Sequence, residues 1–533
     1  MVLNNVRSSV SVIHINDNDV KEQPADFKTA LSATGFGAYN FLLVLLLIPA
    51  AWANAIDLTK ETFLLASAEC DFQMTLIRKS LLVSAVYIGM MSSTFFWSFV
   101  TDRIQRRPLF LLGLLVDALC NIVSSLVESF YVFLLLKFIT GTIVGGPFTL
   151  LSPYLSEFQS MKYNKKIATW SGFIFSWGFI IPAILAFNIL PQSWSFILFE
   201  RVYPSWRIYL LLCSIPSVVG FFTMLFLPES PKQLMEDGQL TKAHELLKRM
   251  YVINTRMPAD TYPIKQLKLP VKNIDVEPAK TDIKKFNQTW SDIKALFDKK
   301  YLTIFFILNV LQFLIMVGCN TMRLWAPHLF IIMNNFDYSI MWNSTNNSPG
   351  MCDCLTPGII TSGLMNETHY ANQTCVQWYI NRNVYINSSI IASSGIGFSF
   401  IIGLFYTTKM KKRISMTFVY IFTVLCTIAT NWGQVVPLLM LAGSIVVTGR
   451  ITSNIIIVTN TNVIPAQLRT TAIGILTHVG NFGCIIGNFI FPIILQIHCT
   501  GTFIAIGSLL TICLLISYWI MRSKYQAPET SVS

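Results

Sequence analysis

The feature that most restricts the fold of this 533-residue chain is a series of apolar stretches of membrane length. A transmembrane helix needs about 20 mainly apolar residues, because it must cross a hydrocarbon layer about 30 Å thick. Twelve stretches meet this requirement: 36–57, 80–100, 108–128, 131–156, 168–190, 208–227, 303–323, 388–408, 415–434, 436–460, 471–496 and 501–521. Only 12% of the residues are charged, whereas a soluble domain carries about 25%. The sequence therefore predicts an all-α membrane protein with twelve transmembrane helices.

Basic residues are concentrated in alternate loops. The segment 228–301 contains fourteen Lys and Arg residues, whereas the segment 327–387 contains only Arg382. Short cationic loops also follow the second, fourth and eighth apolar stretches. Because Lys and Arg in short loops favour the cytoplasmic side, we expect these loops to be cytoplasmic. An even number of spans then places both termini in the cytoplasm.

The even number of spans and the long hydrophilic segment at residue 228 indicate two six-helix halves. The predicted organisation is a cytoplasmic tail (1–35), an N-terminal half (36–227), a cytoplasmic central loop (228–302), a C-terminal half (303–521) that includes an external loop (327–387), and a second cytoplasmic tail (522–533). Within the central loop, the stretch 240–251 has apolar residues at helical spacing. It predicts a short amphipathic helix that lies against the bundle.

The segment 327–387 has the composition of a lumenal or extracellular lobe. Five N-x-S/T sequons begin in it, at Asn343, Asn346, Asn366, Asn372 and Asn387. It also holds Cys352, Cys354 and Cys375, and we expect Cys70 and Cys499 on the same side. Sequons and clustered cysteines suit an oxidising compartment. We therefore expect N-linked glycans on about half of the sequons, and disulfides in preference to a metal site.

The loop between the second and third spans combines an acid with three basic residues. It reads Ser98-x3-Asp102-x2-Gln105-Arg106-Arg107. A carboxylate at a helix end can pair with an arginine on a neighbouring element, and such a pair can break when helices move. We therefore interpret Asp102, Arg106 and Arg107, with Glu157 after the fourth span, as a latch. The alternative is an ordinary positively charged cytoplasmic loop.

This loop resembles the G-x-x-x-D-x-x-G-R-R signature of the major facilitator superfamily, with Ser98 and Gln105 in place of the two glycines. Further stretches resemble the synaptic vesicle glycoprotein two family and its insect relatives. They are Ser67-Ala68-Glu69, Gly89-Met90, Gly145-Gly146, Ser156-Glu157-Phe158, Ser193-Trp194-Ser195-Phe196, Ser205-Trp206-Arg207, Pro228-Glu229-Ser230-Pro231, Trp325-x-Pro327 and Arg469-Thr470-Thr471-Ala472-x-Gly474. The resemblance covers about residues 35–520. It implies the major facilitator fold, solute transport by alternating access, and gating positions at Pro228, Glu229 and Arg469.

The second half departs from this pattern. At its corresponding loop, Thr407 stands in the place of Asp102, and Gln467 lies where the superfamily usually carries Glu. The resemblance therefore implies acid–cation latches that are complete in the first half and partly lost in the second.

Polar and ionisable residues inside the spans are candidates for a substrate cavity, because such groups are costly in hydrocarbon and usually functional. The candidates are Asn54, Asp57, Lys137, Phe187, Gln312, Asn320, Arg450 and Asn454. For Lys137 and Arg450 the alternatives are a structural ion pair or a side chain that reaches the interface. Phe187 falls at the family's aromatic ligand-cage position, whereas Ser453 and Ile457 replace its Trp and Asp. We expect Asp117 to pack against neighbouring helices.

These features predict a transporter of a small polar or organic solute, anionic or sugar-like, in the plasma membrane or a secretory or synaptic-type vesicle. We expect a monomer in the lipid bilayer, with no cofactor and no metal. The sequence contains no nucleophile–base pair or phosphate loop, so an enzyme is not expected. It contains no basic patch with interleaved aromatics, so nucleic acid is not an expected partner. The alternative is a transport-inactive glycoprotein that acts as a membrane receptor or regulator, which the missing acids of the second half favour.

Overall fold

A computed structural model of the chain describes most of its residues. The described ranges are 25–101, 104–192, 194–198, 201–268, 291, 293–334, 352, 381–405, 409–429, 435–465 and 468–522. Asp102, Cys354, Cys375 and the sequons that begin at Asn343, Asn346, Asn366 and Asn372 lie outside these ranges.

Each of the twelve predicted spans coincides with a helix or with consecutive helices. In the described part, nine helical segments are long and apolar enough to cross a membrane. The other three predicted spans coincide with α5 (Leu76–Thr101), α21 (Arg382–Phe405) and α22 (Lys409–Ala429). The prediction of an all-α membrane protein is confirmed. The structure also contains a short antiparallel hairpin that the apolar pattern did not predict. It is formed by β1 (Ser195–Leu198) and β2 (Arg201–Pro204).

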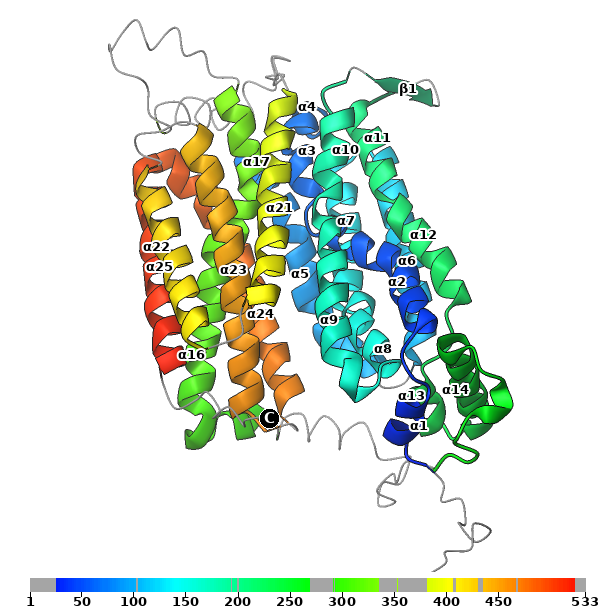
Figure 1. Cartoon of the computed structure of the whole chain (residues 1–533). Helices are drawn as coiled ribbons and strands as arrows, with labels where there is room; N and C mark the ends of the chain where they lie inside the picture. Colours follow the sequence, from blue (N-terminus) through cyan, green and yellow to red (C-terminus); the bar gives the residue numbers. More distant parts are fainter. Residues whose placement is uncertain are drawn as a thin grey trace, which may run out of the picture.

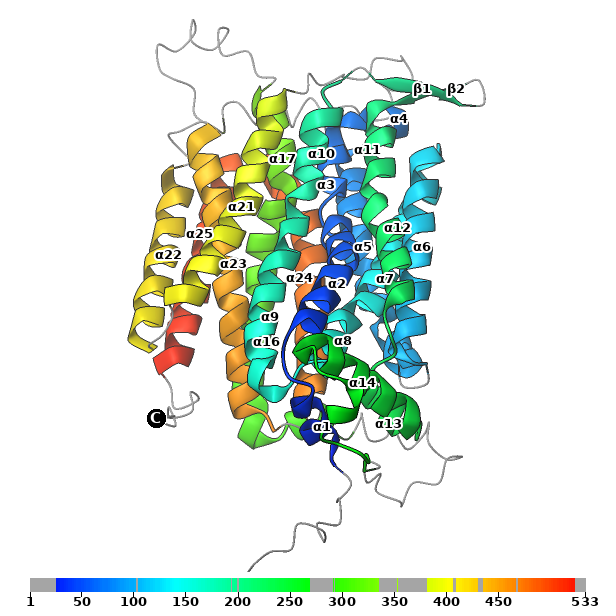
Figure 2. The ribbon, with the colours of Figure 1, turned by 45° about the vertical axis from the view of Figure 1, so that its right-hand side comes forward.

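The helices gather into two groups that lie side by side (Figures 1 and 2). The first group contains α2 (Ala38–Asp57), α3 (Glu61–Ser67), α4 (Glu69–Phe72), α5, α6 (Arg106–Leu126), α7 (Phe130–Gly145), α8 (Leu151–Glu157), α9 (Met161–Ser176), α10 (Ile181–Ile189), α11 (Ser205–Cys213) and α12 (Ile215–Phe226). The second contains α16 (Lys299–Ile315), α17 (Thr321–Asn334), α21, α22, α23 (Val435–Val463), α24 (Arg469–Ile497) and α25 (Cys499–Arg522). The two groups meet where α5 packs on α24, α10 on α21 and α3 on α17.

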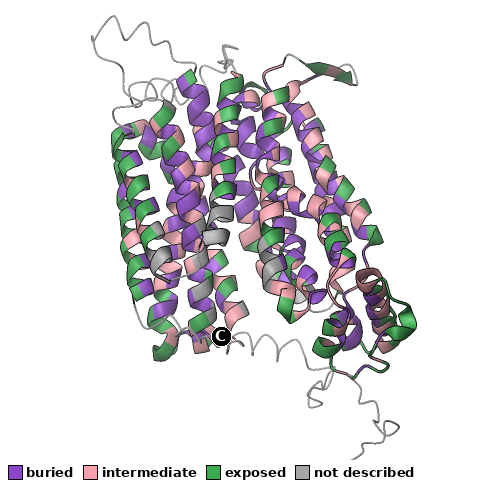
Figure 3. Cartoon of the chain, viewed as in Figure 1, coloured by how far each residue is buried: buried purple, intermediate pink, exposed green. Residues whose placement is uncertain are grey.

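The outer surface of the helices is apolar, whereas buried polar groups lie inside. On α22 the outward-facing residues Phe418, Ile421, Leu425 and Ile428 are exposed. Figure 3 shows this exposed side along the outer helices and the buried side between them. Contiguous exposed apolar surface of this kind is rare on soluble proteins. A helix bundle in a lipid bilayer requires such a surface, because its outer face contacts the hydrocarbon chains of the lipids.

Glycines allow α5 and α7 to approach each other closely. A Cβ at Gly89 would lie 2.3 Å from the carbonyl oxygen of Phe138, and a Cβ at Gly141 would lie 2.3 Å from that of Val86. No side chain fits at either distance, so the two backbones touch directly. Small residues at such crossings are the usual way in which membrane helices pack, since burial of apolar surface drives no association in lipid.

Several spans are interrupted by short turns at or near Gly and Pro residues. α7 ends at Gly145, and the 3₁₀ turn η1 (Pro147–Leu150) leads into α8. The 3₁₀ turn η2 (Trp177–Phe179) similarly joins α9 to α10. In the second group, the π-helical turn η4 (Met316–Asn320) joins α16 to α17. Such π-turns occur frequently at functional sites.

The central segment forms a small helical layer at one end of the bundle, the end at which the described chain both begins and finishes (Figure 1). It contains α13 (Pro231–Glu236), α14 (Leu240–Thr255) and η3 (Ala259–Thr261), and α1 (Phe27–Ala33) packs on it. α14 is the predicted amphipathic helix, and it buries Ala243, Leu247 and Met250. Asn254 accepts a hydrogen bond from the backbone N–H of Tyr39 at 3.0 Å, which joins this layer to the start of α2.

At the opposite end, a disulfide links Cys352 to Cys499 at the start of α25, with a Cα–Cα distance of 5.6 Å. Cys70 is also disulfide-bonded. Cys70, Cys352 and Cys499 are all cysteines that the sequence assigns to the external side. The disulfide at Cys352 thus joins the segment that follows α17 to the start of α25.

Candidate functional site

A cavity of about 330 Å³ lies between the two groups of helices. Thr59, Thr62, Phe63 and Phe179 line it from the first group. From the second group its lining comes from the η4 region, α17, α21 and α23, and includes Ile315, Met316, Cys319, Asn320, Arg323, Ser388, Gly449 and Ser453. The cavity thus sits where relative motion of the two groups would alter its shape.

Arg323 is the one charged residue among the described residues that line the cavity. Its Nη2 donates to Oδ1 of Asn320 at 2.6 Å and to the hydroxyl of Tyr87, on α5, at 3.3 Å. The guanidinium carbon lies 5.6 Å from the centre of the Phe179 ring. Arg323, on the second group, therefore contacts two residues of the first group.

The charge of Arg323 is not neutralised within the described part of the chain, where no carboxylate lies within ion-pair distance of it. Its Nε is buried without a hydrogen-bond partner there. Guanidinium groups carry five N–H donors in a fork that matches a carboxylate. A buried donor without a partner is costly. The arrangement favours an anionic or strongly accepting ligand.

The π-turn and a row of glycines place Asn320 and Arg323 toward the cavity. A Cβ at Gly487 of α24 would lie 2.1 Å from Oγ1 of Thr321, and one at Gly483 would lie 2.8 Å from the carbonyl oxygen of Phe313. α24 therefore packs tightly against α16 and η4. Nδ2 of Asn320 donates to the sulfur of Cys484 on α24 at 2.9 Å, which leaves the amide oxygen to Arg323.

The rest of the lining is mainly apolar. The hydroxyls of Thr59, Ser388 and Ser453 donate to carbonyl oxygens one turn earlier in the chain, at 2.9–3.0 Å. They are therefore largely satisfied without a ligand. A cavity with one cation and aromatic and aliphatic walls suits an organic anion with an apolar body better than a ligand covered with hydroxyls.

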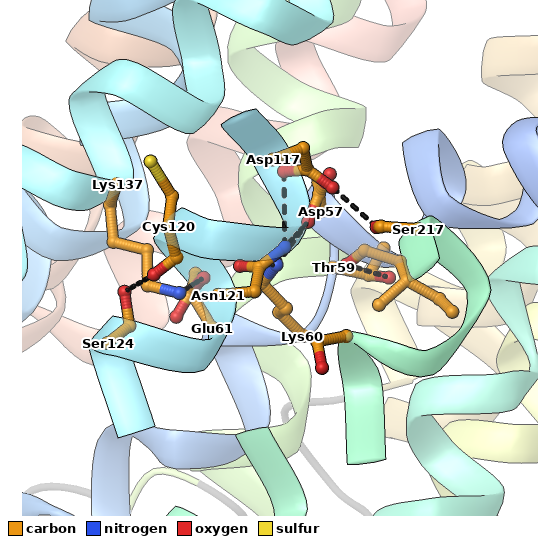
Figure 4. A network of polar contacts seen from close by, with 12 residues as sticks. Asp57, Thr59, Lys60, Glu61, Asp117, Cys120, Asn121, Ser124, Lys137 and Ser217 are labelled. Atoms are coloured by element: carbon orange, nitrogen blue, oxygen red, sulfur yellow. Dashed lines mark hydrogen bonds and ion pairs between the residues drawn. The ribbon is translucent and has the colours of Figure 1, made fainter. Parts of the chain in front are cut away.

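A buried ionic network lies beside this cavity in the first group (Figure 4). Lys137 pairs with Glu61 at 3.0 Å, and Lys60 pairs with Asp57. Asn121 donates to Asp57 at 3.2 Å and to Asp117 at 3.1 Å. The hydroxyl of Ser217 donates to Asp117 at 2.5 Å. The network joins the end of α2 and the start of α3 to α6, α7 and α12.

A second buried pair touches the other group of helices. Lys79 of α5 lies 2.8 Å from a carboxylate oxygen of Glu69, and its Nζ lies 3.4 Å from Nε2 of His328 on α17. All three side chains are buried. The two groups of helices therefore make polar contact between Lys79 and His328 as well as through Arg323.

The predicted latch is present in part. Arg106 pairs with Glu157 at 2.5 Å, which joins the start of α6 to the end of α8. Arg107 donates to the carbonyl oxygen of Leu225 at 2.8 Å. Both contacts stay within the first group of helices, the half to which the sequence assigns the latch. Asp102 and the side chain of Ser98 lie outside what the structure describes.

The other gating positions contact backbone groups. The carbonyl oxygen of Pro228 accepts a hydrogen bond from the hydroxyl of Tyr154 at 2.6 Å. Arg469 donates through Nε to the carbonyl oxygen of Ile464 at 3.0 Å. Glu229 is half-buried. Arg469 thus contacts a main-chain acceptor five residues earlier in the chain.

Of the predicted cavity residues, Asn320 lines the cavity, and Asp57 and Lys137 belong to the ionic network instead. Asp117 is packed among neighbouring helices, as expected. Phe187 stacks under Arg382, 5.9 Å from ring centre to guanidinium carbon, and Gln312 packs at Gly480 of α24.

The structure describes the other predicted cavity and glycosylation residues only in part. Asn54 is half-buried, and its Oδ1 is buried without a partner in the described part. Arg450 and Asn454 lie on α23 beside the lining residues Gly449 and Ser453, but their side chains are not described. Asn387 lies inside α21.

Arg323 and Glu61 were missed by the sequence interpretation. Arg323 was the last residue of a predicted span, 303–323, and looked like a flanking charge. The helix instead continues to Asn334. Glu61 and Lys60 follow the first predicted span directly, and the spacing of Asp57 and Lys60, three residues apart on neighbouring turns, was the available signal.

Comparisons with known proteins agree with this geometry. A family model described as "Sugar (and other) transporter" matches residues 47–343. Synaptic vesicle glycoprotein 2B of Rattus norvegicus is 28% identical over 257 residues, which cover 47% of this chain and 38% of the relative. Synaptic vesicle glycoprotein 2A of Homo sapiens is 25% identical over 338 residues, which cover 60% of this chain and 45% of the relative. The match thus spans less than half the length of these relatives.

Solved structures support the same fold. A partially occluded inward-open structure of the xylose transporter XylE from E. coli has a TM-score of 0.60 at 13% identity, covering 90% of this chain and 97% of that one. An inward-open structure of the same transporter has a TM-score of 0.58 at 12% identity, covering 93% of this chain and 98% of that one. The chain therefore belongs to the sugar (and other) transporter family, has the fold of the major facilitator superfamily, and is similar to synaptic vesicle glycoprotein 2.

Proposed function

We propose that this protein moves a small organic anion across its membrane by alternating access. The observation that carries the proposal is Arg323, a cation without a carboxylate partner in the described residues, in a mainly apolar cavity of about 330 Å³ between the two helical groups. Ligand pockets are commonly of this size and combine apolar walls with a few polar anchors. A carboxylate would take the free donors of Arg323, and its apolar body would lie against Phe63, Phe179 and Met316.

The contacts of Arg323 relate binding to movement. Its hydrogen bond to Tyr87 and its contact with Phe179 join the second group of helices to the first. An anion bound to the guanidinium would compete with these contacts. Solute binding would then alter the balance between conformations, as coupling between a ligand and two states requires.

Uptake into proteoliposomes tests the proposal. We expect the purified full-length chain to accumulate one or more radiolabelled monocarboxylates with an apolar body, and uncharged sugars much less. Empty liposomes provide the control. If a broad panel of anions and neutral solutes is not transported at all, alternating-access transport is the wrong function.

A membrane receptor or regulator without transport activity is the second candidate. The second half lacks the acids of the first, with Thr407 in the place of Asp102 and Gln467 where the superfamily usually carries Glu, and this loss favours it. Binding without transport distinguishes the two: an anion that raises thermal stability but is never accumulated supports the receptor function.

α17 continues to Asn334 and α21 begins at Arg382, so the loop between them is shorter than the 327–387 expected from the sequence. We further propose that this loop, residues 335–381, faces the lumen or the exterior and carries N-linked glycans, with both termini cytoplasmic. Peptide N-glycosidase treatment of the cell-expressed protein should lower its apparent mass. Asn366→Gln and Asn372→Gln together should reduce that shift, whereas Asn287→Gln, in the basic central segment, should not. Cleavage of the loop 335–381 by a protease added to the cytosolic face of intact, sealed vesicles would contradict this orientation.

The membrane in question is the plasma membrane or a secretory or synaptic-type vesicle, as the similarity to synaptic vesicle glycoproteins supports. We propose a monomer, because the cavity is completed by one chain.

A further inference from the structure

A second pocket, separate from the central cavity, opens at the end of the bundle where the helical layer of the central segment lies. Its volume is about 280 Å³. α2, α12 and α14 contribute its walls, and Arg107 enters from the start of α6. The lining consists of Tyr39, Leu42, Leu43, Leu46, Arg107, Leu225, Phe226, Leu227, Pro228, Leu246, Arg249 and Ile253.

The pocket carries two positive charges. Arg107 uses Nη2 to donate to the carbonyl oxygen of Leu225, and its Nε is buried without a partner in the described part of the chain. Arg249 is exposed on α14. Across the described residues, no carboxylate lies within ion-pair distance of either guanidinium. The pocket therefore offers an unneutralised double charge, with at least one buried donor.

The apolar wall of the pocket continues onto the outer surface of the bundle. Phe226 is 82% exposed and Leu42 is 47% exposed. On the same two helices, Phe41 and Leu45 of α2 and Phe222 of α12 are also exposed large apolar residues. A ligand in this pocket thus meets cations at one side and a lipid-facing apolar surface at the other.

We propose that this pocket binds an anionic glycerophospholipid of the cytoplasmic leaflet. The phosphate and the negative headgroup lie at Arg107 and Arg249, and an acyl chain lies along Leu42, Leu46 and Phe226. A soluble anion would use the two arginines but leave the apolar wall exposed. A zwitterionic phospholipid would use the wall and offer one phosphate, but it has no net negative charge to balance both arginines. Charge complementarity and the continuous apolar surface together select the anionic lipid.

The position of the site gives the lipid a structural role. Arg107 follows Arg106, which pairs with Glu157, and Pro228 of the pocket accepts the hydrogen bond from Tyr154 of α8. A bound headgroup would therefore join α14, α2, α6 and α12 at the site of the first-half latch. This inference concerns a regulatory lipid and does not depend on the identity of the transported solute.

Native mass spectrometry of the purified full-length chain tests the inference. The protein is titrated with phosphatidylserine and with phosphatidylcholine of identical acyl chains. We expect one phosphatidylserine to be retained preferentially, and Arg249→Gln to weaken this retention about fivefold, as the loss of one surface charge near a lipid headgroup predicts. Because Arg249 is exposed, the substitution leaves folding intact.

Lys248→Gln is the matched control, since it removes the same charge from the same helix but does not line the pocket. It should retain phosphatidylserine like the unmodified protein. Leu42→Trp, which fills the apolar wall, should lower retention of the lipid and leave both charges in place. Equal retention of the two lipids, or full retention by Arg249→Gln, would overturn the inference. Retention of a sterol in preference to either phospholipid would overturn it as well.

Discussion

Arg323→Gln should weaken the interaction with a transported anion by roughly 10- to 150-fold. The substitution removes a charge-assisted hydrogen bond, which contributes about 1.5–3 kcal/mol, and each 1.4 kcal/mol corresponds to about a tenfold change in affinity. The readout is the concentration dependence of uptake in proteoliposomes for whichever anion the unmodified protein accumulates. Arg323→Lys keeps the charge but loses the planar guanidinium fork, so its affinity for the anion should lie between those of the unmodified protein and Arg323→Gln.

Arg382→Gln is a suitable control for this experiment. Arg382 lies at the start of α21, a helix that lines the cavity, but the side chain is exposed and does not line the cavity itself. Its loss should leave the anion affinity within about twofold, the small effect typical of an exposed charge. Should Arg323→Gln transport the anion with unchanged affinity, Arg323 has no part in binding.

Glu61→Gln should be among the most destabilising single substitutions in this protein, by about 3–5 kcal/mol, because it leaves Lys137 buried without its counter-charge. The pair is 3.0 Å apart, with side-chain exposures of 0% for Lys137 and 5% for Glu61. Lys137→Met should also destabilise the protein, because it leaves Glu61 buried without its counter-charge. The double variant Glu61→Gln with Lys137→Met removes both charges and should recover most of the loss. The measurement is the apparent melting temperature of the detergent-purified protein across the four forms.

An exposed ion pair provides the comparison. Lys232 and Glu236 on α13 are 3.7 Å apart and 47% and 49% exposed. Breaking this pair should cost less than about 1 kcal/mol, as is usual at a surface. If Glu61→Gln melts at the same temperature as Lys232→Gln, the buried network contributes no more than a surface pair. If the double variant is as unstable as the two losses added together, the two residues are not coupled.

The two predictions concern residues that the sequence treated very differently. Lys137 is recognisable from the sequence as an ionisable residue in a span, and a structural ion pair is one of the two alternatives to a cavity role for it. Its partner Glu61 was not identified, because the pair joins α3 to α7 and nothing local to either helix indicates the contact. Arg323 was overlooked because the local sequence does not distinguish an arginine that flanks a membrane helix from one inside it. Only the structure shows that the helix continues to Asn334.

Some features of the fold were predictable because they are local. In hydrocarbon a helix must satisfy all of its own backbone hydrogen bonds, so the length and apolarity of each stretch alone decide where a span lies. The same holds for the amphipathic spacing in α14 and for the breaks at Gly145 and Pro147, where residue type restricts the backbone directly.

By itself, therefore, the sequence determined where the membrane helices lie, apart from the continuation of the seventh to Asn334, and the division of basic and sequon-bearing loops. Only the tertiary structure decided which polar groups meet. It placed Arg323 between Asn320 and Tyr87, paired Lys137 with Glu61, and put Arg107 and Arg249 around one pocket. The physical reason is that these contacts depend on how closely helices approach, and that approach is set by glycines such as Gly141 and Gly487 acting on partners far away in the chain.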